Sequence, residues 1–192
     1  HWGASHVYGH YWRLGCPETL ALLEDCLKNT DTLIFWSHDP DSTHSCYSAN
    51  EGNIWRKWFQ ELGISVIYVD PFVNFTAVKQ GDKYITPRPG TDAAILEAIA
   101  YVWLTEDTYD HEYVAQHVHR FEEWADRILG KGPDGVKKTP KWAEEISGVR
   151  APVIKALARR WASTNTMGGS GVRVGWGSAC RTDNGTDYSR LM

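Results

Sequence analysis

Apolar positions along the chain fall either into short continuous runs or into stripes with helical spacing. Runs at 32–36 (TLIFW) and 65–71 (SVIYVDP) predict buried strands, each followed by turn-forming residues. A third short strand is predicted within 83–90 (KYITPRPG), and a glycine-flanked strand followed by an open loop within 168–185. Short apolar strands separated by helices predict a parallel sheet with right-handed crossover connections.

Helical stripes fill the intervals between these strands. In the segment 53–63, Ile54, Trp58, Phe59 and Leu62 share one face, which we expect to point inward. The segment 91–107 predicts a helix capped by Thr91 or Asp92. Further helices are predicted after Pro17, around 110–129, at 140–147 and at 152–163. The expected fold class is therefore α/β: an open doubly wound parallel sheet, Rossmann-like, flanked by helices.

Composition and charge narrow the function classes. A hydrophobic share of 42% and a charged share of 23% are ordinary for a globular domain, and a net charge of -4 provides no basic surface for nucleic acid. No apolar run is long enough to predict a membrane span. The ten Trp residues suit either a packed core or a site for flat ligands. The cysteines lack CxxC or cluster spacing, so we interpret them as buried thiols: Cys16, Cys26, Cys46 and Cys180.

Ligands of open α/β sheets bind at the carboxyl ends of the strands. At these ends, all four predicted strands are followed by residues that could bind a ligand. They are Trp36-Ser37-His38-Asp39-Pro40, Asp70-Pro71, Pro87-Arg88-Pro89-Gly90-Thr91-Asp92, and Gly175-Trp176 through Arg181. Carboxylates in this position suit a nucleotide, whose ribose hydroxyls and base N–H groups need acceptors, and Arg181 suits a phosphate or a base. Each residue also fits an ordinary turn, with Asp92 as a helix cap and Gly90 and Gly175 serving backbone conformation. The set of four is better evidence than any member.

Other site types compete with this interpretation. An NAD-binding domain needs G-x-G-x-x-G after its first strand, where this chain has SHDPDS, and a P-loop is also absent. A stand-alone module for a purine nucleotide remains open, and the mass of the native source protein would discriminate it from part of a larger enzyme. A metal-binding protein is the third alternative, using His1, His6, His10, His38 and His44.

The motifs TLIFWSHDP, SVIYVDP, YITPRPGTDAAILEAIAYVWLTED, TPKWAEEISGVR and GWGSACRTDNG, in this order, resemble the dimethyl sulfoxide reductase family of molybdopterin oxidoreductases. The resemblance covers about residues 6–192. It implies that 1–192 is a single α/β domain that binds molybdopterin guanine dinucleotide, cut from a larger catalytic subunit, with 1–16 as an irregular lead-in. The cofactor-binding residues that it implies are Trp36, Ser37, His38, Asp39, Asp70, Pro71, Pro89, Gly90, Asp92, Gly175, Trp176 and Arg181. Two departures are Phe72, where members often have Arg, and Gly185-Thr186-Asp187, where many continue G-E-Q.

The resemblance also implies an activity. It points to a cytoplasmic oxidoreductase that holds molybdenum, or tungsten, between two of these dinucleotides. Within the family it favours a transhydroxylase that converts pyrogallol (1,2,3-trihydroxybenzene) to phloroglucinol, with iron–sulfur clusters only in a partner subunit. The metal ligand is expected upstream of His1, so no metal ligand is assigned in this chain and the catalytic residues remain unassigned. The isolated chain is expected to be inactive and to hold no molybdenum tightly, which metal analysis of the purified chain tests.

Overall fold

The computed structural model describes residues 23–37, 39, 51–170 and 183–191. A four-stranded sheet forms its centre, with all strands parallel and in the order β3-β2-β1-β4. The predicted parallel sheet of an α/β fold is thus confirmed. The strands are β1 (Thr32–Trp36), β2 (Ser65–Val69), β3 (Lys83–Ile85) and β4 (Thr166–Ser170).

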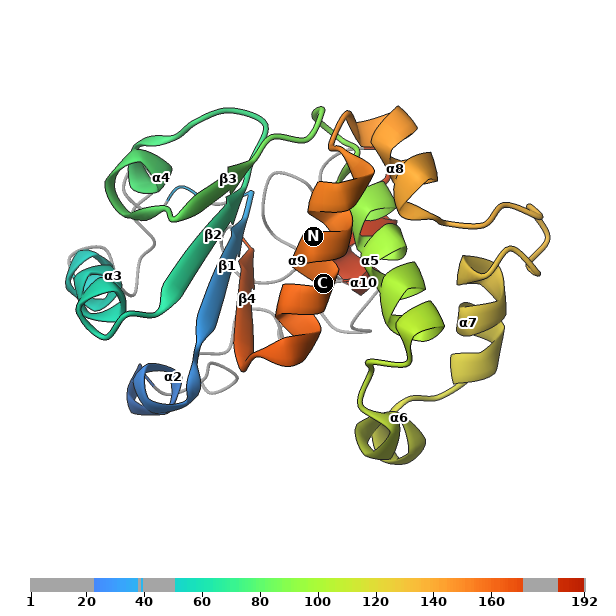
Figure 1. The fold of residues 1–192 in the computed structure, drawn as a ribbon, viewed down its shortest axis with the longest axis horizontal. Helices are drawn as coiled ribbons and strands as arrows, with labels where there is room; N and C mark the ends of the chain where they lie inside the picture. The colour runs from blue at the N-terminus through green and yellow to red at the C-terminus, as the bar shows by residue number, and fades with distance from the viewer. Residues whose placement is uncertain (1–22, 38, 40–50, 171–182, 192) are drawn as a thin grey trace.

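Helices lie on both faces of the sheet (Figure 1). One face is covered by α2 (Leu23–Asn29), α3 (Glu51–Glu61) and α4 (Phe75–Gln80). The other face is covered by a layer that contains α5 (Asp92–Glu106), α8 (Pro140–Ser147), α9 (Ala151–Ser163) and α10 (Gly185–Leu191). The short helices α6 (His111–His117) and α7 (Phe121–Ile128) follow α5 at the outside of this layer.

Alternation of side chains along β1 divides the core into two clusters. Leu33 packs with Phe59 and Cys26 on the α2–α4 side, whereas Ile34 and Trp36 pack under α5 and α9. Burial of Cys26, assisted by the neighbouring charge of Asp25, raises the pKa of the thiol. The buried-thiol interpretation is thus confirmed for Cys26, and the other three cysteines lie outside the described residues.

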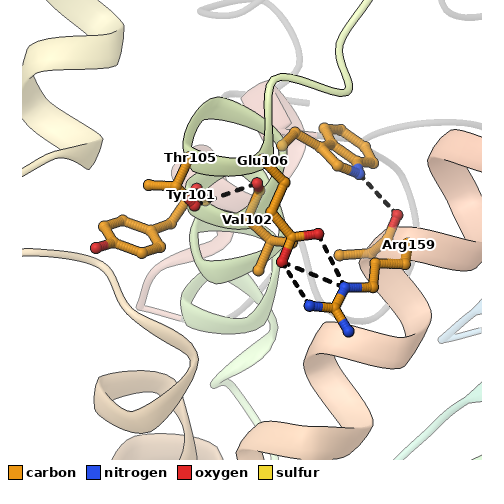
Figure 2. Close-up of polar contacts among 7 residues, drawn as sticks. Tyr101, Val102, Thr105, Glu106 and Arg159 are labelled. Atoms are coloured by element: carbon orange, nitrogen blue, oxygen red, sulfur yellow. Dashed lines mark hydrogen bonds and ion pairs between the residues drawn. The ribbon is translucent and has the colours of Figure 1, made fainter.

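Helix α5 is the centre of the second layer. It is apolar on nearly every side, and its first nine residues and Val102 are buried against neighbours that include α8, α9 and α10. Near its carboxyl end the Trp103 indole N–H donates to the backbone oxygen of Ala158 on α9 (2.8 Å). The Arg159 guanidinium also binds both carboxylate oxygens of Glu106, as Figure 2 shows. These contacts fix α9 against α5, and α5 begins at the edge of the sheet where the candidate site lies.

The prediction that the apolar side chains of the helix at 53–63 point inward is largely wrong. Phe59 is buried, but Ile54, Trp58 and Leu62 are 51%, 40% and 59% exposed. The buried neighbour of Phe59 is instead Arg56, which is 6% exposed. Helical periodicity located the helix but not its orientation, because an apolar stripe can also face a partner outside the described structure.

Two helices were not expected from the sequence. Helix α4 begins after Asn74, whose side-chain oxygen caps it by accepting from the N–H of Ala77 (2.8 Å). Helix α10 begins at Gly185, where an open loop was expected, and it packs on α5. None of the helices in the described part of the chain is both long and apolar enough to cross a bilayer.

Candidate functional site

Three strand ends meet at one edge of the sheet. Trp36 pairs with Val69 and Val69 with Ile85, so β1, β2 and β3 end side by side. Asp39, Asp70 and Asp92, which follow these strands, lie close enough for the charges of Asp39 and Asp92 both to act on Asp70. The expected convergence of these loops on one sheet edge is confirmed. The fourth loop, with Gly175, Trp176 and Arg181, lies outside the described residues, as does His38.

Asp92 is the first residue of α5 and is 3% exposed. Its Oδ1 accepts a hydrogen bond from the indole N–H of Trp36 at 2.8 Å. Trp36 itself is fully buried and lies 6.4 Å from the ring of Tyr188, centroid to centroid. Burial raises the pKa of Asp92, while the bond from Trp36 opposes that rise. The indole therefore fixes the orientation of this carboxylate, a contact that joins positions 56 residues apart.

The helix cap expected at Thr91 or Asp92 lies at Thr91 by position, but without the side-chain bond of a cap. Thr91 occupies the N-cap position without a side-chain cap bond, and its hydroxyl donates to the backbone oxygen of Arg88 (2.7 Å). The Arg88 guanidinium donates to the carbonyls of Glu145 and Ile146 at the end of α8 (3.0 and 3.1 Å). These hydrogen bonds fix the PRPGTD segment in place. Asp92 is the one carboxylate that the segment brings to the sheet edge.

Asp70 directly follows β2 and is 7% exposed. Its Oδ1 accepts from the backbone N–H of Phe72 (3.3 Å), and Asn74 supplies a second, side-chain hydrogen bond. Burial raises the pKa of Asp70, and the charges of Asp39 and Asp92 raise it further against these two bonds. A buried carboxylate among like charges favours ligands that bring hydrogen-bond donors.

Asp39 lies half-buried, three residues after the end of β1. Its Oδ1 accepts from the hydroxyl of Thr76 on α4 at 2.6 Å. This bond connects Asp39, after β1, to helix α4, between positions 37 residues apart in the chain. Thr76 was not among the residues expected at the site, because nothing local in the sequence indicates so distant a contact.

Tyr84, in the middle of β3, is a second residue that the sequence did not indicate. Its hydroxyl is buried and has no hydrogen-bond partner in the described part of the chain. Burial, with the charges of Asp70 and Asp39, raises the pKa of Tyr84 to about 12. The phenol is therefore protonated at physiological pH and offers a donor beside the carboxylates.

Two backbone features shape the same edge. Ser37 has a φ of 50°, in the left-handed region that a non-glycine residue rarely adopts, while its N–H donates to Val69 O (2.8 Å). Gly90 has a φ of 78°, which a side chain would strain, and Pro89 beside it is exposed. Pro71 is half-buried after Asp70. Of these residues only Ser37 has a strained backbone, and such strain collects at binding sites.

The site is chemically a set of hydrogen-bond acceptors with one phenol donor. Three carboxylates suit a ligand with several N–H and O–H groups, such as a nucleoside. The residues that the structure describes include no group of three or more His, Cys, Asp or Glu side chains able to hold a metal ion. The histidines of the metal-binding alternative, His1, His6, His10, His38 and His44, all lie outside those residues. The geometry therefore supports binding of a polar organic ligand at this edge.

Asp70→Asn is expected to stabilise the ligand-free chain at neutral pH. The single amide oxygen still accepts from Phe72 or Asn74, whereas the buried charge and its repulsion by Asp39 and Asp92 disappear. Because the folded-state pKa of Asp70 is raised, the native chain loses stability as pH increases from the ordinary carboxyl pKa through the raised one. The difference between variant and native chain should therefore be small below pH 4 and largest at pH 7–8. A gain of about 1 kcal/mol in the free energy of unfolding would raise Tm by roughly 2–4 °C.

Thermal melts across this pH range test the prediction, with Asp25→Asn at an exposed position as the control. An unchanged Tm of the Asp70→Asn chain at pH 7 would contradict it.

The family model described as "Molybdopterin oxidoreductase" matches residues 12–187. The chain is 50% identical over all of its 192 residues to the pyrogallol hydroxytransferase large subunit of Pelobacter acidigallici, of which it covers 22%. It is 36% identical to dimethyl sulfoxide reductase DmsA of Escherichia coli, with 99% of this chain and 23% of that protein covered. The chain thus spans about a fifth of the length of these relatives.

A solved structure shares the fold. Acetylene hydratase from Pelobacter acetylenicus superposes with a TM-score of 0.67 at 21% sequence identity, covering 86% of this chain and 20% of that one. The family model extends over most of the chain, including every described strand and the three carboxylates at the sheet edge. The chain therefore belongs to the molybdopterin oxidoreductase family, whose members bind a molybdenum cofactor.

Proposed function

We propose that this chain holds the guanosine end of a molybdopterin guanine dinucleotide within the large subunit of a transhydroxylase that converts pyrogallol to phloroglucinol. The observation that carries the proposal is the convergence of Asp39, Asp70 and Asp92 on one sheet edge, with Asp92 oriented by Trp36. The 50% identity to a pyrogallol hydroxytransferase large subunit supports the choice of reaction.

The donor pattern of guanosine fits these carboxylates. The Watson–Crick edge of guanine presents N1–H and the N2 amine side by side, and one carboxylate accepts both. We assign Asp92 to this edge, because Trp36 occupies only one lone pair of its Oδ1. Asp70 and Asp39 accept from the ribose hydroxyls. The Tyr84 hydroxyl, which lacks a partner in the described structure, donates to an oxygen of the ligand.

The remaining proposed contacts line the same edge. Ser37, Pro71, Pro89 and Gly90 bring backbone close to the ligand, and His38 is assigned on the resemblance alone. Trp36 acts through Asp92 rather than by touching the ligand. Gly175, Trp176 and Arg181 are further proposed contacts, with Arg181 suited to a phosphate by its charge. These residues are proposed on the family resemblance of their motifs.

The proposal extends to the architecture around the site. We place residues 1–192 as one doubly wound, Rossmann-like domain of a larger cytoplasmic subunit, with 1–16 as a lead-in. Helices on both faces of a parallel sheet support this arrangement. An iron–sulfur small subunit is the proposed partner. The name of the Pelobacter acidigallici relative, a large subunit, supports an assembly of more than one chain.

The division of labour in the reaction follows from the residues present. The bound cofactor, with molybdenum or tungsten, supplies the redox chemistry on the polyhydroxybenzene. The contribution of this chain is to anchor one nucleotide end, exclude water from the buried carboxylates and keep Tyr84 protonated as a donor. A fixed anchor positions the reactive end of a long cofactor, because displacement at one end is transmitted to the other.

Cofactor analysis of the purified large subunit tests the proposal. Acid release should yield a guanine nucleotide, and the enzyme should convert pyrogallol to phloroglucinol with a tetrahydroxybenzene cosubstrate. Absence of guanine nucleotide would overturn the cofactor assignment. Guanine nucleotide with reduction of sulfoxides or N-oxides, and no conversion of pyrogallol, would instead favour another oxidoreductase of the family.

A further inference from the structure

The outer layer formed by α3 and α4 carries most of the exposed apolar side chains. In the described part of the chain, eleven large hydrophobic residues are substantially exposed, and seven of them lie between positions 54 and 78. We call these seven the α3–α4 outer surface: Ile54 (51% exposed), Trp58 (40%), Leu62 (59%), Phe72 (68%), Val73 (60%), Phe75 (73%) and Val78 (73%). Ile54 and Trp58 lie on α3, and Phe75 and Val78 lie on α4. Leu62 directly follows α3, and Phe72 and Val73 precede α4. The two helices lie on the same side of the sheet (Figure 1).

The core of this domain does not use these side chains. The inward positions of the two helices are already filled by Phe59 and Ala77, which pack with Leu33 and Tyr68 of the sheet. A typical monomer shows a largest apolar patch of roughly 300–600 Å². Seven large side chains at 40–73% exposure, on α3, on α4 and in the residues beside them, mark a candidate interaction surface.

The backbone of residues 72–78, which carries part of this surface, is held in place by hydrogen bonds. Asn74 is 3% exposed and caps α4, and Thr76 is fully buried and bonded to Asp39. The N–H of Phe72 is bonded to Asp70. The backbone is therefore fixed by buried polar contacts while Phe75 and Val78, the two most exposed of the set, point away from the core.

We infer that the α3–α4 outer surface packs against another part of the same large-subunit polypeptide. The inference rests on the proposed function only in placing this chain within a larger subunit. The chain covers 22% and 23% of the two curated relatives described above, so about four fifths of each polypeptide is available as the covering body. The charged residues beside the surface include Lys57 and Glu61, which are paired to each other, and the exposed Lys79.

This packing is coupled to the cofactor edge. Asp39 and Asp70, proposed to hold the ribose, also anchor the segment that presents Phe72, Phe75 and Val78. A body seated on this segment therefore borders the nucleotide and limits access of water to the carboxylates. Loss of the docking contact is expected to loosen the cofactor without any change in the groups that touch it.

Thiol labelling at Val78→Cys tests the docking surface. In the large subunit purified without its partner, maleimide modification at position 78, located by peptide mass spectrometry, should be at least tenfold slower in native protein than after unfolding in urea. In the 192-residue chain alone, at micromolar concentration, it should proceed at close to the unfolded rate. Val136→Cys, the same change at a residue outside the surface, reports general shielding by the subunit.

Each other result overturns the inference. Rapid labelling of the native large subunit shows an uncovered surface, and protection that appears only on addition of the small subunit assigns it to that partner. Protection of the 192-residue chain that increases with its concentration assigns the surface to a second copy. Guanine nucleotide content of the same sample is measured separately. A covered surface without guanine nucleotide therefore contradicts the proposed function and not the docking surface.

Discussion

Asp92→Asn is expected to weaken retention of the guanine dinucleotide by roughly tenfold to a hundredfold, equivalent to about 1–3 kcal/mol for a buried pairing lost. The asparagine oxygen still accepts from Trp36, so the fold should keep its stability. Toward guanine, however, the side chain offers one acceptor and turns an amine toward a donor. Titration of the cofactor-free large subunit with the dinucleotide measures the loss.

Asp110→Asn is the matched control for this variant. Asp110 caps α6 by accepting from the N–H of Tyr113 (2.8 Å), so the same substitution at another helix start tests capping alone. It should leave the affinity unchanged. Equal affinity of the Asp92→Asn subunit and the native subunit would contradict the assignment of Asp92 to guanine.

Trp36→Phe is expected to lower the free energy of unfolding by about 2–4 kcal/mol, from a lost buried donor and a smaller ring. The Asp92 carboxylate then loses the indole bond that opposes its desolvation. Affinity for the dinucleotide should also fall, because Asp92 is no longer oriented. Urea unfolding and cofactor titration measure the two effects.

Two further variants separate the hydrogen bond from the ring. Trp103→Phe removes an indole N–H that donates to Ala158 near the carboxyl end of α5, so it should destabilise less and leave cofactor affinity unchanged. In the double variant Trp36→Phe/Asp92→Asn, removal of the charge should recover part of the stability lost in Trp36→Phe. Strictly additive losses would contradict a stabilising Trp36–Asp92 contact.

The strands and their carboxyl ends were predictable because they depend on local patterns. TLIFW and SVIYV are apolar runs bounded by turn residues, and parallel strands bring Asp39, Asp70 and Asp92 to one edge by topology alone. The sequence also holds a signal for helix α4, because Asn is a preferred N-cap residue and Asn74 stands directly before the helix.

Contacts between distant positions were not predictable from one sequence. The Trp36–Asp92 and Thr76–Asp39 bonds join residues 56 and 37 positions apart, and their formation depends on rotamers within a packed core. The predicted orientation of α3 was wrong for a related reason. Its periodicity marks Ile54, Trp58 and Leu62 as apolar but does not specify whether this domain or a neighbour covers them.

The central claim is that guanosine binds at the edge where β1, β2 and β3 end. The most direct test is a titration of the 192-residue chain, with ¹⁵N-labelled tryptophan, by GDP and by ADP, following the indole N–H resonance of Trp36. The account predicts saturable shifts of this resonance with GDP and an affinity at least about tenfold greater than for ADP, equivalent to about 1.4 kcal/mol. Equal affinities, or GDP binding that leaves the Trp36 resonance unmoved, would contradict it.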